Sequence, residues 1–231
     1  KEILLNEQTS FHVKEAYKAL RTNVMFSAPD EGCKVIAVTS SIPSEGKSTT
    51  VMNLSITFAQ TGSRVLLIDG DMRRPNIKRI LESDTEKGLA DVLAKFTTLE
   101  DTIQISQYKN LHILYSGNIP PNPAELLASE NMENTINELK VKYDYIFIDT
   151  PPINVVTDVS VVSRLTHGII LVTRQDVSKK DEVIEALNRL GFVNAKIIGL
   201  VLNDITYQSK RKYYRYGKYK YNYEKDSYGY D

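Results

Sequence analysis

A short apolar run, a polar turn and the residues Gly46-Lys47-Ser48-Thr49 constrain this chain more than any other feature. The apolar run, residues 34–39, has the composition of a buried strand, and a helical pattern begins directly after the turn. The backbone N–H groups at such a helix start favour a phosphate. Lys47 would reach its β and γ groups, and the Ser48 hydroxyl would ligate Mg²⁺. The segment predicts a nucleotide site made of Ser44, Glu45, Gly46, Lys47, Ser48 and Thr49.

One position departs from the usual phosphate-loop pattern, G-x-x-x-x-G-K-[ST], because Ser41 stands where the first glycine is expected. The alternative is an ordinary strand–turn–helix that carries a surface lysine. The apolar strand before the turn and the helical pattern after it favour the phosphate loop.

Composition sets the broad class of protein. The 231 residues suffice for one well-cored α/β domain, which we expect over residues 1–205. Cys33 is the only cysteine, which excludes an intrachain disulfide and is typical of a reducing cytosol. No apolar run has the length of a membrane span, and no signal peptide is visible. The expected location is cytoplasmic.

Apolar, β-rich segments alternate with helical patterns along most of the chain. Strands that are apolar on both faces and alternate with helices indicate a doubly wound, mostly parallel sheet with helices on both faces. The fold class is therefore α/β. The expected strands are 34–39, 65–69, 111–115, 145–149, 168–173 and 197–202, and the expected helices are 10–26, 47–60, 89–96, 124–139 and 179–190.

Charged side chains follow two of these strands directly. Asp69, Asp71 and Arg73 come at the end of one strand, and Asp149 ends another. The carboxyl ends of parallel strands meet at the ligand crevice, so these carboxylates are expected to surround Mg²⁺ beside Ser48, mostly through waters. Each aspartate alone is equally consistent with a cap or a turn. Arg73 would stabilise transferred charge or pair with Asp71.

The last 26 residues, 206–231, differ from the rest. They contain no Leu, Ile, Val, Met or Phe, and from Tyr207 onward they carry seven Lys and Arg against three Asp and Glu. We expect a mobile tail. Interleaved Lys and Tyr can also bind nucleic acid or anionic lipid headgroups, or form a plain linker. Beside a nucleotide site, phosphate acceptors are the better explanation, and the candidates are Tyr213, Tyr214, Tyr216, Tyr219, Tyr221, Tyr223, Tyr228 and Tyr230.

Four features follow one another along the chain in the order found in one family of enzymes. They are the loop at residues 43–49, the motif Asp69-x-Asp71-x-Arg73, the strand end Asp149-Thr150-Pro151-Pro152 and the tyrosine-rich tail. Nearly the whole chain resembles the bacterial tyrosine kinases, which are P-loop NTPases encoded with capsule and exopolysaccharide export systems. The resemblance implies Walker A, A′ and B motifs and ATP and Mg²⁺ as cofactors. It implies metal ligation by Ser48, Asp71 and Asp149, and catalytic roles for Lys47, Asp69, Asp71, Arg73 and Asp149.

The same family carries E-x-x-R-x-x-R on an N-terminal helix that mediates ring assembly. This chain has Glu15-x-x-Lys18-x-x-Arg21, and the spacing puts the three residues on one stripe of the helix expected within 10–27. Lysine cannot make the bidentate fork of arginine, and the stripe is also consistent with a solvated face. The resemblance implies a homo-oligomeric ring, which is an octamer in this family.

Further roles follow from the same resemblance. Asn203 ends a strand where related ATPases recognise adenine, and its amide can both donate and accept, although a turn-forming asparagine is the alternative. The implied partners are a membrane activator, which recruits the kinase to the inner face of the plasma membrane, and a tyrosine phosphatase. No nucleic-acid partner is expected.

The sequence thus indicates an ATP-dependent tyrosine kinase that autophosphorylates its tail in trans and regulates polysaccharide polymerisation and export. One alternative is a P-loop ATPase switch of the cell-division and partitioning type, whose signature lysine would fall at Ile42. Another is a nucleotide-gated scaffold of a membrane polysaccharide complex. Phosphorylation of the tail distinguishes the three.

Overall fold

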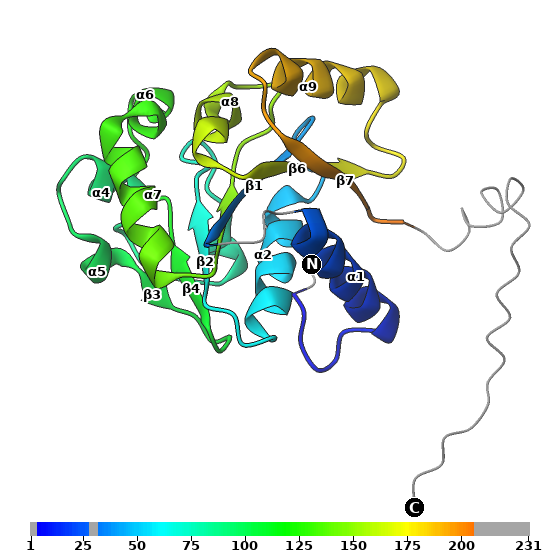
Figure 1. Ribbon diagram of the computed structural model, residues 1–231, viewed down its shortest axis with the longest axis horizontal. Coiled ribbons are helices and arrows are strands. Elements are labelled where there is room, and N and C mark those ends of the chain that lie inside the picture. Colours follow the sequence, from blue (N-terminus) through cyan, green and yellow to red (C-terminus); the bar gives the residue numbers. More distant parts are fainter. Residues whose placement is uncertain (1–3, 28–31, 206–231) are drawn as a thin grey trace, which may run out of the picture.

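The computed structural model describes residues 4–27 and 32–205 (Figure 1). Within these residues, one seven-stranded sheet has the order β3-β4-β2-β5-β1-β6-β7. Adjacent strands of this sheet are parallel, except for the short antiparallel pair β3–β4. The expected α/β class with a mostly parallel sheet is confirmed. The strands are β1 (Lys34–Ser40), β2 (Val65–Asp69), β3 (Gln104–Ile105), β4 (Leu111–Leu114), β5 (Tyr145–Asp149), β6 (Gly168–Arg174) and β7 (Ile197–Asn203).

Helices cover both faces of the sheet (Figure 1). Side chains of α1, α2 and α3 join the apolar cluster on one face, whereas those of α4 and of α6 to α9 join the cluster on the other. The helices are α1 (Phe11–Ser27), α2 (Lys47–Ala59), α3 (Ile77–Ile80), α4 (Leu89–Leu93), α5 (Leu99–Thr102), α6 (Pro123–Ala128), α7 (Glu130–Lys142), α8 (Asp158–Val162) and α9 (Lys180–Phe192), with a 3₁₀ turn η1 (Ser163–Leu165).

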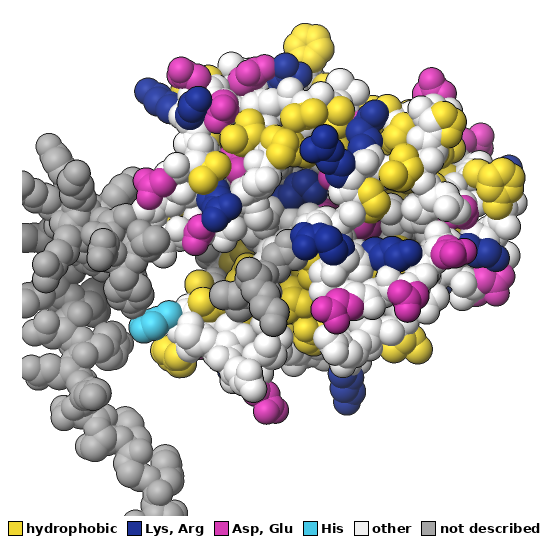
Figure 2. Space-filling model, turned by 180° about the vertical axis from the view of Figure 1, so that it is seen from behind, with side chains coloured by type: hydrophobic (Ala, Val, Ile, Leu, Met, Phe, Trp, Pro, Cys, Tyr) yellow, Lys and Arg dark blue, Asp and Glu magenta, His cyan; other side chains and the backbone are white. Residues whose placement is uncertain are grey.

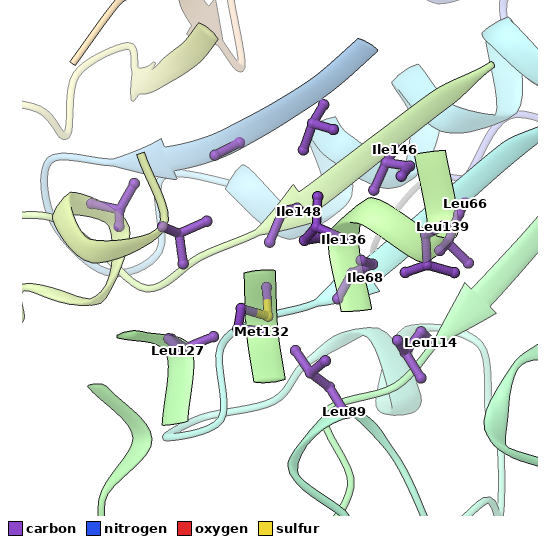
Figure 3. Packing of buried hydrophobic residues seen from close by; sticks show 14 of the residues in the cluster. Leu66, Ile68, Leu89, Leu114, Leu127, Met132, Ile136, Leu139, Ile146 and Ile148 are labelled. Carbon is purple, nitrogen blue, oxygen red and sulfur yellow. The ribbon is translucent and has the colours of Figure 1, made fainter. Parts of the chain in front are cut away.

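The central strands divide their side chains between the two clusters. On β5, Ile146 and Ile148 join the cluster under α7, and Phe147 joins the cluster under α2. Figure 3 shows Ile146 and Ile148 packed with Met132 and Ile136 of α7. This alternation explains why the central strands carry apolar residues at successive positions, as a sheet covered on both faces requires. Because the sheet is packed on both faces, the ends of its central strands have fixed positions relative to one another.

Two local predictions were wrong. The helix expected over 124–139 is two helices, because Ser129 has extended backbone angles (φ −71°, ψ 157°) and its hydroxyl accepts the Met132 N–H as the N-cap of α7. Strand β3 was not expected, since two exposed residues carry no periodic pattern. The expected tail, residues 206–231, lies outside the described residues.

The surface is uneven despite the formal net charge of zero. On the face turned away from the viewer in Figure 1, Lys and Arg side chains gather near the middle and acidic side chains lie mostly toward the rim (Figure 2). At the sheet edge, Leu200 and Leu202 of β7 are half exposed, and so is Ile205 just after it. Among the described residues, no helix has the length and hydropathy needed to span a bilayer.

Candidate nucleotide and phosphoryl-transfer site

The predicted phosphate loop joins a fully buried strand to a largely buried helix. Strand β1 is buried along its whole length, and α2 begins at Lys47 directly after Gly46. Gly46 has φ +87°, a left-handed conformation that glycine adopts without steric cost. No side chain caps the first turn of α2, so its backbone N–H groups remain directed at the loop, as phosphate binding requires.

Four polar side chains converge at the carboxyl end of the sheet. The Lys47 Nζ lies 3.1 Å from Asp71 Oδ2 and 3.2 Å from Asp149 Oδ1. The Ser48 hydroxyl donates to Asp149 Oδ2 at 2.5 Å. All four side chains are buried or nearly so. The structure therefore brings together the lysine, hydroxyl and carboxylates that three separate sequence motifs supplied; below we call this set the Lys47 cluster.

Asp69 borders the Lys47 cluster because the register of β2 and β5 pairs it with Asp149. Its carboxylate is fully buried and accepts the Ile77 N–H at 3.1 Å and the Asp71 N–H at 3.3 Å. Gly70 permits this arrangement, since a Cβ there would lie 2.9 Å from the Asp149 carbonyl oxygen, which accepts the Gly70 N–H. The two strand ends thus approach as closely as backbone allows.

Burial and mutual charge set the protonation of these groups. Burial, followed by the charge of Asp149, raises the pKa of Asp69 to about 8. Burial also raises the pKa of Asp149, although Lys47 and Ser48 oppose the shift. Burial disfavours the Lys47 ammonium, but Asp149 and Asp71 outweigh it, and the pKa of Lys47 is raised. One ammonium faces three carboxyl groups, and burial favours the neutral form of both Asp69 and Asp149.

Arg73 does not pair with Asp71, which corrects one of the two expectations for it. Its guanidinium forms a fork on Asp158, with Nε 2.9 Å from Oδ2 and Nη2 3.0 Å from Oδ1. Asp158 is the first residue of α8 and is fully buried. Sequence reasoning missed Asp158 because nothing near it resembles a motif. The only available signal is an isolated carboxylate nine residues after Asp149.

Glu45 is engaged within the loop. Its carboxylate is fully buried and accepts the Ser41 hydroxyl at 2.6 Å, the Ile42 N–H at 2.9 Å and the Ser178 hydroxyl. The side chain thus fastens the turn to the segment that follows β6. The Glu45 side chain is thus engaged by protein donors, and its expected part in nucleotide binding stays a prediction. Ser44 also has a left-handed backbone, with φ +69°.

Asn203 lies against the loop from the neighbouring side. Its amide nitrogen donates to the Glu45 carbonyl at 3.0 Å, which leaves the amide oxygen and one N–H for another partner. Arg174 of β6 reinforces the same junction, since it donates to the Ser44 carbonyl at 3.1 Å and pairs with Asp204 at 2.7 Å. Asn203 therefore lies beside the phosphate loop, and its expected role in adenine recognition stays a prediction; Arg174 was not singled out in the sequence.

The three residues of the expected assembly stripe have different contacts. Glu15 and Lys18 form an exposed ion pair of 2.8 Å. Arg21 instead turns toward α2 and donates to the Thr57 carbonyl at 2.9 Å. Only the first two remain at the surface as a charged pair. The eight candidate acceptor tyrosines lie outside the described residues.

The donor set fits a magnesium–nucleotide complex. A hydroxyl and two carboxylates, from Ser48, Asp71 and Asp149, are oxygen ligands of the kind that Mg²⁺ takes together with waters and phosphate oxygens. Within residues 4–27 and 32–205, no three His, Cys, Asp or Glu side chains form a ready-made metal cage.

Comparisons with known proteins identify the family. A family model described as an AAA domain matches residues 33–189. The chain is 37% identical to the tyrosine-protein kinase YwqD of Bacillus subtilis, over 93% of this chain and 90% of YwqD. The solved structure of the chimerical protein CapA2B2 superposes with a TM-score of 0.82 at 37% identity, covering 86% of this chain and 88% of that one. The chain belongs to the bacterial tyrosine kinases.

This tyrosine kinase also shares its fold with a nucleotide-dependent ATPase. The septum site-determining protein MinD of Pyrococcus horikoshii, solved with Mg-ADP, matches at a TM-score of 0.63 and 28% identity, over 78% of this chain and 76% of MinD. Nucleotide binding with Mg²⁺ is general to this fold.

Proposed function

We propose that this kinase uses Mg-ATP to phosphorylate the tyrosines of residues 206–231 in trans and thereby regulates polymerisation and export of a capsular or extracellular polysaccharide. The observation that carries the proposal is the Lys47 cluster, where Lys47 and Ser48 meet Asp71 and Asp149 at the carboxyl edge of the sheet. Strand β7, from which the tyrosine-rich segment continues, ends at the same edge beside the loop.

The residues divide the chemistry as follows. Lys47 and the N–H groups at the start of α2 hold the β- and γ-phosphates, and Ser48, Asp71 and Asp149 hold Mg²⁺. When bound there, the metal would supply positive charge to the phosphate oxygens. The tyrosine oxygen bonds to the γ-phosphorus. At the same time the bond between the γ-phosphorus and the bridging oxygen breaks, and ADP leaves with that oxygen. The phenolic proton goes to Asp69 in its ionised form, and the raised pKa makes that carboxylate a stronger base than an ordinary one.

Transfer in trans requires a neighbour, and α1 supports one. Glu15 and Lys18 present an exposed charged pair on that helix, on the stripe through which related kinases form rings. In a ring, a tethered acceptor segment has a raised effective concentration at the next active site. We further propose an octameric ring as the assembly, and a membrane activator that recruits the kinase to the inner face of the plasma membrane. A tyrosine phosphatase would reverse the modification.

A mixing experiment tests transfer in trans with full-length chains. The enzyme is a variant with all eight acceptor tyrosines changed to Phe, and the substrate is Lys47→Met, which lacks the cation for the phosphates. Incubation with γ-labelled ATP should label only the Lys47→Met chain when both are present, and neither chain alone. Mass spectrometry then maps the label. If Lys47→Met became labelled when incubated without the other variant, the assignment of the site would be overturned. If neither chain were labelled in the mixture, transfer in trans would be overturned.

The likeness to MinD supports one second candidate, an ATPase switch. The discriminating measurement is the fate of the γ-phosphate in the wild-type chain. A kinase produces phosphotyrosine in step with ADP, whereas a switch releases inorganic phosphate and leaves the tyrosines unmodified. Phosphate release without phosphotyrosine would favour the switch.

A further inference from the structure

An arginine–aspartate pair links the β2 and β5 segments at each end of the two strands. At the amino ends, Arg64 and Asp144 lie 2.8 Å apart (Nη2 to Oδ1). At the carboxyl ends, Arg73 and Asp158 form the fork described above. The two pairs use the same chemistry on the same two neighbouring strands, but only the second lies beside the Lys47 cluster. The first pair therefore serves as a natural control for the second.

The two pairs differ in burial. The Arg64 and Asp144 side chains are 60% and 42% exposed, so their attraction is weakened by solvent. Asp158 is fully buried and starts α8, whose Val159 and Val162 lie in the apolar core. A buried carboxylate on a packed helix cannot follow the arginine, so Asp158 fixes the guanidinium rather than the reverse.

The fork leaves part of the guanidinium for another ligand. Arginine has five N–H donors, and Asp158 takes one from Nε and one from Nη2. No other acceptor contacts Arg73 within the part of the chain that the structure describes. Three donors remain on a side chain that is 39% exposed. Arg73 stands two residues after Asp71, which contacts Lys47, so the arginine follows the Lys47 cluster closely along the chain.

We propose that Asp158 is a positioning residue for phosphoryl transfer, which holds the Arg73 guanidinium so that its three remaining N–H donors face the transferred phosphoryl group. Guanidinium donors in a fixed plane match phosphoryl oxygens in pairs. Preorganised donors aimed at the charge of the transition state lower the barrier without weakening or strengthening ground-state binding. The proposal rests on the proposed function, since it names a further residue of the same site.

A double-mutant cycle on the full-length kinase tests this role. Asp158→Asn keeps the shape but loses the charge that aligns Arg73, and we expect kcat for phosphotyrosine formation to fall about tenfold or more, as misaligned catalytic groups do. The KM for ATP and the affinity for a fluorescent ADP analogue should stay within twofold. Arg73→Ala should lower kcat by a similar factor, and Arg73→Ala/Asp158→Asn should be no slower than Arg73→Ala.

Two further variants keep the test decisive. Arg73→Lys leaves a cation opposite the buried carboxylate but cannot form the fork, so it should fold and lose kcat as Asp158→Asn does. The matched control Asp144→Asn removes the equivalent charge at the far end of the same strands and should leave kcat within twofold. Melting temperatures show which variants are folded. If Asp158→Asn does not fold, Arg73→Lys decides the question.

Three results would overturn the proposal: wild-type kcat in folded Asp158→Asn, wild-type kcat in Arg73→Lys, or losses that multiply in the double mutant. Failure of the proposed function is recognised separately, because the wild-type chain would then form no phosphotyrosine. In that case the same cycle is read from release of inorganic phosphate, in which water takes the place of the tyrosine hydroxyl and the positioning of Arg73 has the same effect.

Discussion

The Asn203 side chain fills the space that a Cβ on Gly46 would need. An ideal Cβ built on Gly46 would overlap the Asn203 Nδ2, which donates to the neighbouring Glu45 carbonyl at 3.0 Å. The phosphate loop and the end of β7 are therefore fitted to each other at the one glycine of the loop. This contact joins the segment that holds phosphates to the residue expected to recognise the base.

Replacement of Gly46 by Ala should destabilise the kinase by two separable effects. The φ of +87° imposes a strain of about 1–2 kcal/mol on a side-chain-bearing residue, and the overlap with Asn203 adds to it. Gly62→Ala is the matched control, because Gly62 has φ +94° with nothing within 4 Å of its Cβ position. Chemical denaturation should show a larger loss for Gly46→Ala, partly restored in Gly46→Ala/Asn203→Ala. Equal losses for the two single variants would contradict the overlap.

Glu45→Gln should loosen the phosphate loop. The carboxylate serves three donors from Ser41, Ile42 and Ser178, and a glutamine amide offers only one acceptor oxygen to them. Groups left without partners in a buried site cost about 1–3 kcal/mol. The free energy of unfolding should fall by that amount, and nucleotide affinity should weaken with it. Glu133→Gln, an exposed position on α7, is the control and should change neither quantity.

The residues of the stripe on α1 should have different roles: Glu15 and Lys18 in assembly, and Arg21 in stability. Glu15→Ala/Lys18→Ala removes the exposed pair through which the proposed ring forms, so it should lower the mass measured by light scattering. Because the pair is worth only about 0.3–0.5 kcal/mol, the melting curve should stay almost unchanged. Arg21→Ala removes the hydrogen bond to Thr57 and should lower the melting temperature. A double variant with wild-type mass would return Glu15 and Lys18 to the role of a solvated face.

The Cys33 thiol should be unreactive at neutral pH. Burial raises its pKa from 9.0 to about 11, and only the thiolate is alkylated. The rate with iodoacetamide should rise with a midpoint near pH 11 in the native kinase and near pH 9 in denaturant. Because the folded pKa is the higher one, the contribution to stability is complete below pH 9 and is lost as the pH rises toward 11. A native midpoint near pH 9 would show that the thiol is not protected.

Sequence alone was sufficient for the parts of the site that carry a motif or end a predicted strand. The phosphate loop and the acidic residues at two strand ends could be placed together, since parallel strands end at one edge of the sheet and the central strands are apolar on both faces. Lys47, Ser48, Asp71 and Asp149 meet there. The prediction needed only the direction of the strands.

Partners that carry no motif and do not end a strand could not be found in this way. Asp158 meets Arg73 across 85 residues, and Ser178 meets Glu45 across 133. A single aspartate or serine in a loop has no pattern of its own, and its role appears only when the fold brings it to a partner. The inward orientation of Glu45 was missed for the same reason. The break at Ser129 is different, because its N-cap role is local.

The charge balance of the Lys47 cluster has a consequence for which anions the site admits. In this cluster two carboxyl groups, those of Asp71 and Asp149, face one ammonium. A bare polyanion approaching this edge meets repulsion as well as the attraction of the helix start. A complex that brings its own divalent cation relieves that repulsion. We therefore expect these carboxylates to favour binding of metal-complexed nucleotide over binding of free nucleotide, sulfate or inorganic phosphate.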